Sequence, residues 1–173
     1  QAGNYPMTTT SNRIYARIAG FTFLFYIAVG MTSLSLGNEV QFVELLYLLQ
    51  NLSALVLGVT LYMFTREHGP ALALLALTCR IMEAVHDQSE IFFAVGSLLF
   101  CWLLLRGRVI PGGLAWLGVI ASALLVAILP LQLGGFLAST SWASSATWIV
   151  WMPMLAFEVA LSLWFLIKGA AAT

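Results

Sequence analysis

The sequence contains very little charge. Only 8% of its 173 residues are Asp, Glu, Lys or Arg, whereas 61% are hydrophobic and the mean hydropathy is +0.97. A chain of this composition has too little polar surface to cover a water-soluble globule. The formal net charge is zero and no basic cluster is present, which excludes the electrostatic footprint of a nucleic-acid-binding protein.

The motifs of common soluble enzymes are also lacking. The sequence has no glycine-rich phosphate loop, no Ser/His/Asp set around a nucleophile elbow and no dinucleotide fingerprint, and we expect no cofactor. Cysteine is scarce too. Cys79 and Cys101 both lie in apolar runs, where a buried and unreactive thiol is expected.

Long apolar runs, in contrast, recur along almost the whole chain, and they are long enough to cross a hydrocarbon layer of roughly 30 Å. We therefore predict an all-α integral membrane protein, a bundle of about six transmembrane helices in a single domain over residues 13–168. The predicted helices cover residues 13–35, 40–65, 71–87, 90–106, 112–133 and 144–168.

The two ends of the chain are predicted to be short tails. The first apolar run is a full span rather than a short signal segment, so we expect it to remain as an anchor. The opening QAGNYP is polar and precedes Met7, the expected natural start, so residues 1–12 are predicted to be a disordered tail that is partly foreign sequence. Residues 169–173 form a second tail.

The third and fourth helices must be separated by a break. The stretch from Ala71 to Arg106 contains no proline, and a single helix of that length would reach roughly 54 Å. The only polar cluster available is HDQS at residues 86–89. We predict a very tight turn there between two short spans.

The basic residues indicate the orientation, because cytoplasmic loops carry the excess of Lys and Arg. With six spans, all basic residues except Arg80 fall on one side of the membrane, namely Arg13, Arg17, Arg66, Arg106, Arg108 and Lys168. The connections on the other side contain none. We therefore expect both termini to be cytoplasmic, in a bacterial inner membrane.

Arg80 is the exception, because it lies about midway along the third predicted helix, where a charge costs roughly 2.5–3.5 kcal/mol. It needs a partner, either Glu83 one turn on or Glu158 across the bundle. Offsets of three and seven residues place Arg80, Glu83 and Asp87 on one stripe that must face protein or water.

Further polar residues fall inside or beside the spans and predict a polar pocket formed by the second, third and sixth helices in the outer half of the membrane. Its candidate acid–base residues are Glu83, Asp87 and Glu158. Its candidate binding residues are Arg80, His86, Glu90, Glu44, Tyr47, Gln50, Asn51 and Trp151.

A metal site is a weaker alternative for part of this segment. Glu83 and His86 have the Glu-x-x-His spacing found in di-iron bundles. Those bundles use the motif twice with further glutamates, whereas the only other histidine here is His68, in a predicted cytoplasmic loop. We therefore predict no metal.

Three functions fit these residues. The leading one is a pocket that binds a small or lipophilic molecule, either without chemistry or as an acid–base cyclase or isomerase of a lipid-like substrate. The second is a non-catalytic subunit or carrier whose buried charges are structural. The third is a proton-coupled transporter, although the inner halves of the spans look too apolar for a proton path. Membrane lipid is the expected partner, and the sequence leaves undecided whether the chain forms a homo-oligomer.

Several segments resemble a bacterial multi-pass membrane family known as domain of unknown function 4386. They are MTTTSNRIYARIAGFTFLFYIAVG, RIMEAVHD, LLLRGRVIPGGLAWLGVIA and FEVALSLWFLIKG. The resemblance implies a helical membrane fold and no established activity. Family members usually carry a further segment between an Arg-x-x-Glu helix and a helix that opens with His-Asp. This chain lacks it, in agreement with the tight break at residues 86–89.

Overall fold

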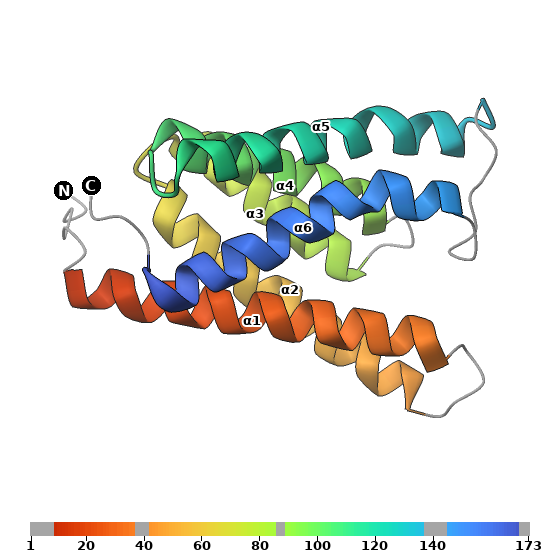
Figure 1. Ribbon diagram of the computed structural model, residues 1–173, viewed down its shortest axis with the longest axis horizontal. Helices are drawn as coiled ribbons and strands as arrows, with labels where there is room; N and C mark the ends of the chain where they lie inside the picture. The colour runs from red at the N-terminus through yellow and green to blue at the C-terminus, as the bar shows by residue number, and fades with distance from the viewer. Residues whose placement is uncertain (1–8, 37–41, 86–88, 137–144, 170–173) are drawn as a thin grey trace.

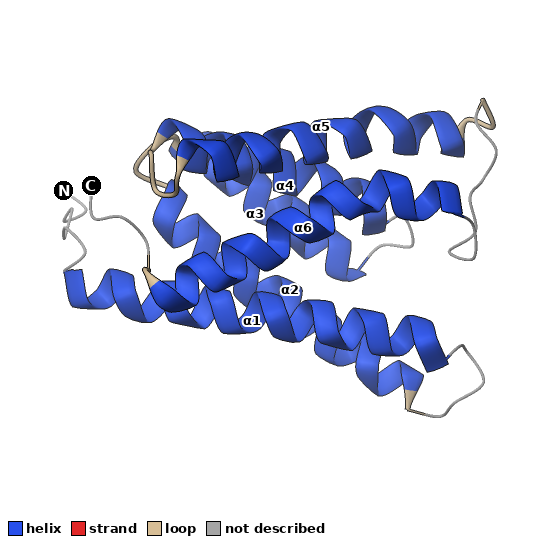
Figure 2. Ribbon diagram, in the orientation of Figure 1, coloured by secondary structure: helices blue, strands red, loops and turns tan. Residues whose placement is uncertain are grey.

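The computed structural model describes residues 9–36, 42–85, 89–136 and 145–169, and every regular element in these ranges is a helix (Figures 1 and 2). In chain order they are α1 (Thr9–Leu36), α2 (Val43–Thr65), α3 (Pro70–Val85), α4 (Ser89–Arg106), α5 (Gly112–Leu133) and α6 (Ser145–Ile167). All six predicted helices are present. The largest difference in a boundary is at α1, which begins at Thr9 rather than at residue 13.

The connections between helices follow the local sequence. The predicted break between the third and fourth helices is confirmed, because α3 ends at Val85 and α4 begins at Ser89, with residues 86–88 outside the described part. At the end of α4, Arg108 adopts a left-handed backbone conformation with a φ of 50°. The next amide, that of Val109, then donates to the carbonyl oxygen of Leu104 at 3.1 Å, which ends the helix.

The helices form a closed ring (Figure 1). Each helix packs against its neighbour in the chain, α6 returns to pack against α1, and α2 also touches α4. The start of α1 and the end of α6 lie at the same end of the ring as the α2–α3 and α4–α5 connections, whereas the end of α1 and the start of α2 lie at the opposite end. We call these the terminal end and the far end.

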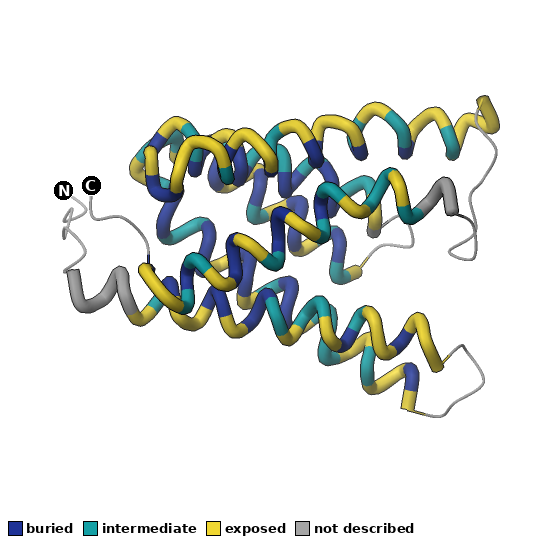
Figure 3. Tube along the Cα trace, viewed as in Figure 1, coloured by how far each residue is buried: buried dark blue, intermediate teal, exposed yellow. Residues whose placement is uncertain are grey.

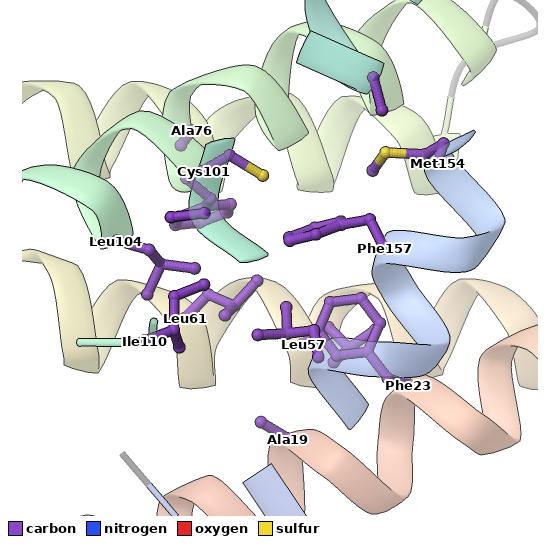
Figure 4. Packing of buried hydrophobic residues seen from close by; sticks show 14 of the residues in the cluster. Ala19, Phe23, Leu57, Leu61, Ala76, Cys101, Leu104, Ile110, Met154 and Phe157 are labelled. Atoms are coloured by element: carbon purple, nitrogen blue, oxygen red, sulfur yellow. The ribbon is translucent and has the colours of Figure 1, made fainter. Parts of the chain in front are cut away.

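The interior of the ring towards the terminal end is filled by apolar side chains. Phe157 of α6 points into the bundle towards side chains from α2 and α4 (Figure 4). Leu57, Leu61, Phe100 and Leu104 are at most 2% exposed, so this part of the interior is closely packed.

The outer surface, whose exposed positions are yellow in Figure 3, is apolar as well. Large hydrophobic side chains that are more than half exposed include Phe21, Leu48, Leu74, Ile120 and Ile149. Soluble monomers rarely expose apolar surface on this scale, whereas a lipid-facing surface must be apolar. Four of the described helices, α1, α2, α5 and α6, contain segments long and apolar enough to cross a membrane, an arrangement typical of an integral membrane protein.

Candidate functional site

Arg80 is the centre of a buried polar network. Its side chain is 1% exposed, and its Nη1 donates to Oε2 of Glu83 at 2.7 Å, one turn further along α3. Its Nη2 donates to Oγ of Ser97 on α4 at 3.0 Å, and its Cζ lies 4.8 Å from the centroid of the Phe93 ring. The guanidinium is thus held by a carboxylate, a hydroxyl group and an aromatic face. Of the two partners considered from the sequence, Glu83 forms the ion pair.

A glycine on α2 makes room for this arginine. A Cβ atom at Gly58 would lie 2.9 Å from the Cβ of Arg80 and 3.1 Å from Cδ1 of Leu77. Real Cβ atoms almost never approach another atom below 3.0 Å. Because residue 58 has no side chain, α3 can bring the start of the Arg80 side chain against the backbone of α2.

Glu83 connects this network to α1. Its second carboxylate oxygen, Oε1, accepts a hydrogen bond of 2.9 Å from the hydroxyl group of Tyr26. Both oxygens of Glu83 therefore have partners, as a buried carboxylate requires. We call Tyr26, Arg80, Glu83 and Ser97 the Arg80 network.

Glu158 is different. It lies on α6, is 5% exposed, and its Oε1 atom has no hydrogen-bond partner among the residues that the structure describes. The same part of the chain shows no ion pair between Glu158 and Arg80, since Arg80 is paired only with Glu83. A buried carboxylate oxygen without a donor is costly, so its surroundings require explanation.

A cavity of about 340 Å³ at the far end of the ring supplies those surroundings. We call it the polar pocket. It lies among α1, α2, α4 and α6, with Glu83 contributed by the end of α3. Its polar lining residues are Tyr26, Ser33, Tyr47, Gln50, Glu83, Glu90 and Glu158. Its aromatic lining is completed by Phe93, Trp148 and Trp151, with the Phe93 and Trp151 ring centroids 5.7 Å apart.

The structure brings together most of the residues singled out from the sequence. Six of them line the polar pocket, namely Tyr47, Gln50, Glu83, Glu90, Trp151 and Glu158, and Arg80 is bonded to one of these. Glu44 is exposed in the first turn of α2 and Asn51 is half-buried, and neither lines the pocket. His86 and Asp87 lie outside the described residues.

The Glu-x-x-His arrangement is not continued on one described helix, because α3 ends at Val85, before His86. Within the described ranges no group of three or more His, Cys, Asp or Glu side chains is placed to hold a metal ion. Cys79 and Cys101 are both free and buried, as expected from their apolar surroundings.

Sequence reasoning missed Tyr26, Phe93 and Ser97, since it assigned the pocket to the second, third and sixth helices only, and it also missed Trp148 on the sixth helix. Tyr26 comes from α1, and Phe93 and Ser97 come from α4, while Trp148 precedes Trp151 by one turn of α6. Tyr26 had a usable signal, because a tyrosine well inside an apolar span is not explained by an interfacial aromatic belt. A serine or phenylalanine in an apolar run, such as Ser97 or Phe93, carries no comparable signal.

Comparison with known proteins finds a family that is similar to part of the chain. No curated protein and no solved structure matches the chain. A model of the family described as "Domain of unknown function (DUF4386)" matches residues 85–169. The matched residues run from the last residue of α3 through α6, and so include Glu90, Trp151 and Glu158, whereas Tyr26, Arg80 and Glu83 precede them. Over these residues, the resemblance to domain of unknown function 4386 that was predicted from the sequence is confirmed.

Proposed function

We propose that this chain is a bacterial inner-membrane protein of six spans, with both termini cytoplasmic, whose polar pocket binds a small or lipophilic molecule. The observation that carries the proposal is the position of Glu158. Its carboxylate is buried, lines a cavity of about 340 Å³ and has an oxygen without a donor among the described residues.

The distribution of charge supports the orientation. Arg17, Arg66, Arg106 and Arg108 lie at or near the terminal end of the ring, and Lys168 follows the last turn of α6 at the same end. The far end carries the acidic Glu44 and Glu90, each in the first turn of its helix. Since cytoplasmic segments are enriched in Lys and Arg, the terminal end fits the cytoplasmic side.

The size and lining of the pocket support binding. Small-molecule sites typically measure about 300–1,000 Å³ and combine an apolar lining with a few polar groups that fix orientation. The polar pocket has this character, with Met154 and Leu155 beside the carboxylates of Glu83 and Glu158. A ligand that donates a hydrogen bond or carries a positive charge would satisfy Glu158.

The alternative of a purely structural role accounts for only part of the site. In the Arg80 network, both oxygens of Glu83 and both terminal nitrogens of Arg80 have partners, so helix registry is a sufficient explanation for those residues. A role in fixing the helix registry does not explain why Glu158 faces a cavity and not a partner side chain. The carboxylate outside the network therefore favours a binding function.

Acid–base chemistry on the bound molecule is a second candidate, and Glu158 is again the residue that favours it. A buried carboxyl group that lines a cavity can exchange a proton with a bound substrate, as in a cyclase or isomerase. A proton-coupled transporter fits less well, because the interior on the terminal side of Arg80 is filled by Leu61, Phe100 and Leu104.

The proposal is tested by filling the pocket. Leu155→Trp places an indole in the cavity, whereas Leu163→Trp puts the same group on an exposed position of the same helix. Both variants and the parent protein are purified from membranes and analysed by native mass spectrometry with lipid extract. We expect a small molecule that accompanies the parent and Leu163→Trp but not a folded Leu155→Trp. A ligand retained equally by both variants, or no ligand in any of them, would contradict the proposal.

A further inference from the structure

We infer that the ligand of the polar pocket is a lipophilic organic cation, that is, an amine or a quaternary ammonium group attached to an apolar body. The inference rests on the proposed binding function and names the chemical class of the ligand. It is carried by two observations, the uncompensated carboxylates of the pocket and the aromatic side chains beside them.

The charges that line the pocket do not balance. Glu83 is already paired with Arg80 at 2.7 Å, so this pair is neutral as a unit. Glu158 and Glu90 also line the pocket, and none of its described lining residues is a lysine or an arginine. Glu158 is the decisive one because it is 5% exposed and has an oxygen without a donor, whereas Glu90 is exposed at the pocket's edge. A positive group beside Glu158 would restore neutrality in a region shielded from water.

The aromatic lining favours a cation that is organic. Phe93, Trp148 and Trp151 line the same cavity as Glu158. The Phe93 ring already lies 4.8 Å from the guanidinium carbon of Arg80, so this site pairs aromatic rings with positive charge. Aromatic faces attract ammonium groups, and attraction is stronger where water is excluded. Calcium, in contrast, needs six to eight oxygen ligands, and the described residues contain no cluster of ligating side chains that could hold a metal ion.

The rest of the lining requires an apolar body on the ligand. Ile27, Met31, Leu34, Met154 and Leu155 surround the polar groups. A small hydrophilic amine would leave these surfaces poorly filled, whereas an amphiphilic amine would satisfy Glu158 and bury its apolar part. An anionic ligand is disfavoured because it would be buried near Glu158 and Glu90.

The test uses three probes of similar size that differ in charge: benzyltrimethylammonium, its neutral carbon analogue neopentylbenzene, and the anion benzylsulfonate. Binding to the full chain in lipid nanodiscs is measured by native mass spectrometry and by the shift of the thermal unfolding midpoint. We expect the cation to bind at least about tenfold more tightly than either analogue. We also expect Leu155→Trp to abolish its binding.

Two pairs of variants separate the roles of charge and aromatic surface. Glu158→Gln should weaken binding of the cation by about tenfold or more, whereas Glu44→Gln, which removes an equal charge at the same end of the ring but outside the pocket, should leave it unchanged. Trp151→Leu should weaken binding of the cation about threefold or more and leave that of neopentylbenzene nearly unchanged, whereas Trp116→Leu on the exposed surface of α5 should alter neither.

The outcomes distinguish this inference from the proposed function. If neopentylbenzene binds as tightly as the cation, and Leu155→Trp abolishes both, the pocket binds a ligand but its preference for a cation is refuted. If Glu158→Gln and Glu44→Gln weaken the cation equally, the effect belongs to the surface charge and the inference also fails. If no probe binds and no native ligand is lost in Leu155→Trp, the inference and the proposed function both fail.

Discussion

The hydroxyl group of Tyr26 on α1 donates a 2.9 Å hydrogen bond to Glu83 on α3, although the backbones of these two helices do not pack against each other anywhere in their described lengths. The bond crosses the interior of the ring and connects α1 to the other residues of the Arg80 network. It also fixes the carboxylate of Glu83 from the side opposite Arg80. Tyr26 is therefore both a structural link and part of the pocket lining.

Removing this link should destabilise the ring moderately. In Tyr26→Phe, Oε1 of Glu83 loses its donor, and we expect the free energy of unfolding to fall by about 0.5–2 kcal/mol, in line with measured hydrogen bonds between membrane helices. Reversible unfolding in mixed micelles measures the change. Tyr62→Phe is the control, because Tyr62 packs against the core but its hydroxyl makes no hydrogen bond within the described residues. Equal losses in the two variants would contradict the role assigned to the Tyr26 bond.

The Arg80–Glu83 pair should tolerate removal of both charges better than removal of one. Arg80→Met leaves Glu83 buried without its cation, and we expect a loss of about 3–5 kcal/mol in the free energy of unfolding. The double variant Arg80→Met/Glu83→Gln should recover part of that loss, since no uncompensated charge remains. A double-mutant cycle measured by unfolding provides the comparison. Strictly additive effects would show that the two side chains do not interact.

Close packing between α1 and α6 should depend on Gly20. A Cβ atom there would lie 2.8 Å from the carbonyl oxygen of Ser162 and 2.9 Å from Cγ of Leu166. Because the first of these is backbone, the helices themselves must separate, and we expect Gly20→Ala to cost about 1–3 kcal/mol. Gly113→Ala, which adds a methyl group where nothing lies within 4 Å, should be neutral or slightly stabilising. Thermal unfolding of the two variants tests this, and a stable Gly20→Ala protein would refute the close contact.

The proposed six-span topology predicts which cysteines react from each side of the membrane. Glu67→Cys and Arg106→Cys should be labelled by an impermeant maleimide only from the cytoplasmic side, and Val85→Cys, 78% exposed at the end of α3, only from the outer side. Cys79 and Cys101 should stay unlabelled because they are buried. Labelling of Val85→Cys from the cytoplasmic side would show that α3 and α4 do not cross the membrane.

The helices could be predicted from the sequence because lipid imposes a simple rule, that backbone polar groups must bond within each span. Apolar runs and the polar cluster at residues 86–89 therefore mark helices and their break. The site could be predicted only in part. Arg80, Glu83 and Glu158 stand out because charges are rare in such a chain, and two of them pair as expected. The pattern could not show that Tyr26 reaches Glu83 across the ring, because this contact depends on the order of the helices around the ring.

The sequence also could not show which of the two buried carboxylates, Glu83 or Glu158, forms an ion pair. Glu83 and Glu158 look alike in the sequence. Each is a glutamate in an apolar helix, with another candidate site residue within two turns, Arg80 for Glu83 and Trp151 for Glu158. Glu83 is one turn from Arg80, so its pairing is local and predictable. Glu158 lies on α6, whose backbone does not contact that of α3 in the described ranges. Whether a cavity or a side chain faces it is decided by packing, which the sequence pattern does not encode.

The shortness of α3 and α4 has a consequence for the surrounding lipid. With 16 and 18 residues, they rise about 24 and 27 Å, less than the roughly 30 Å of a typical hydrocarbon layer, and in Figure 1 they end before α1, α5 and α6 at the far end. A bilayer meets such a mismatch by thinning locally. Headgroups and water should therefore reach deepest beside Glu90, where α4 begins. Access to the pocket would then depend on bilayer thickness, with longer acyl chains slowing ligand exchange without any change in the protein.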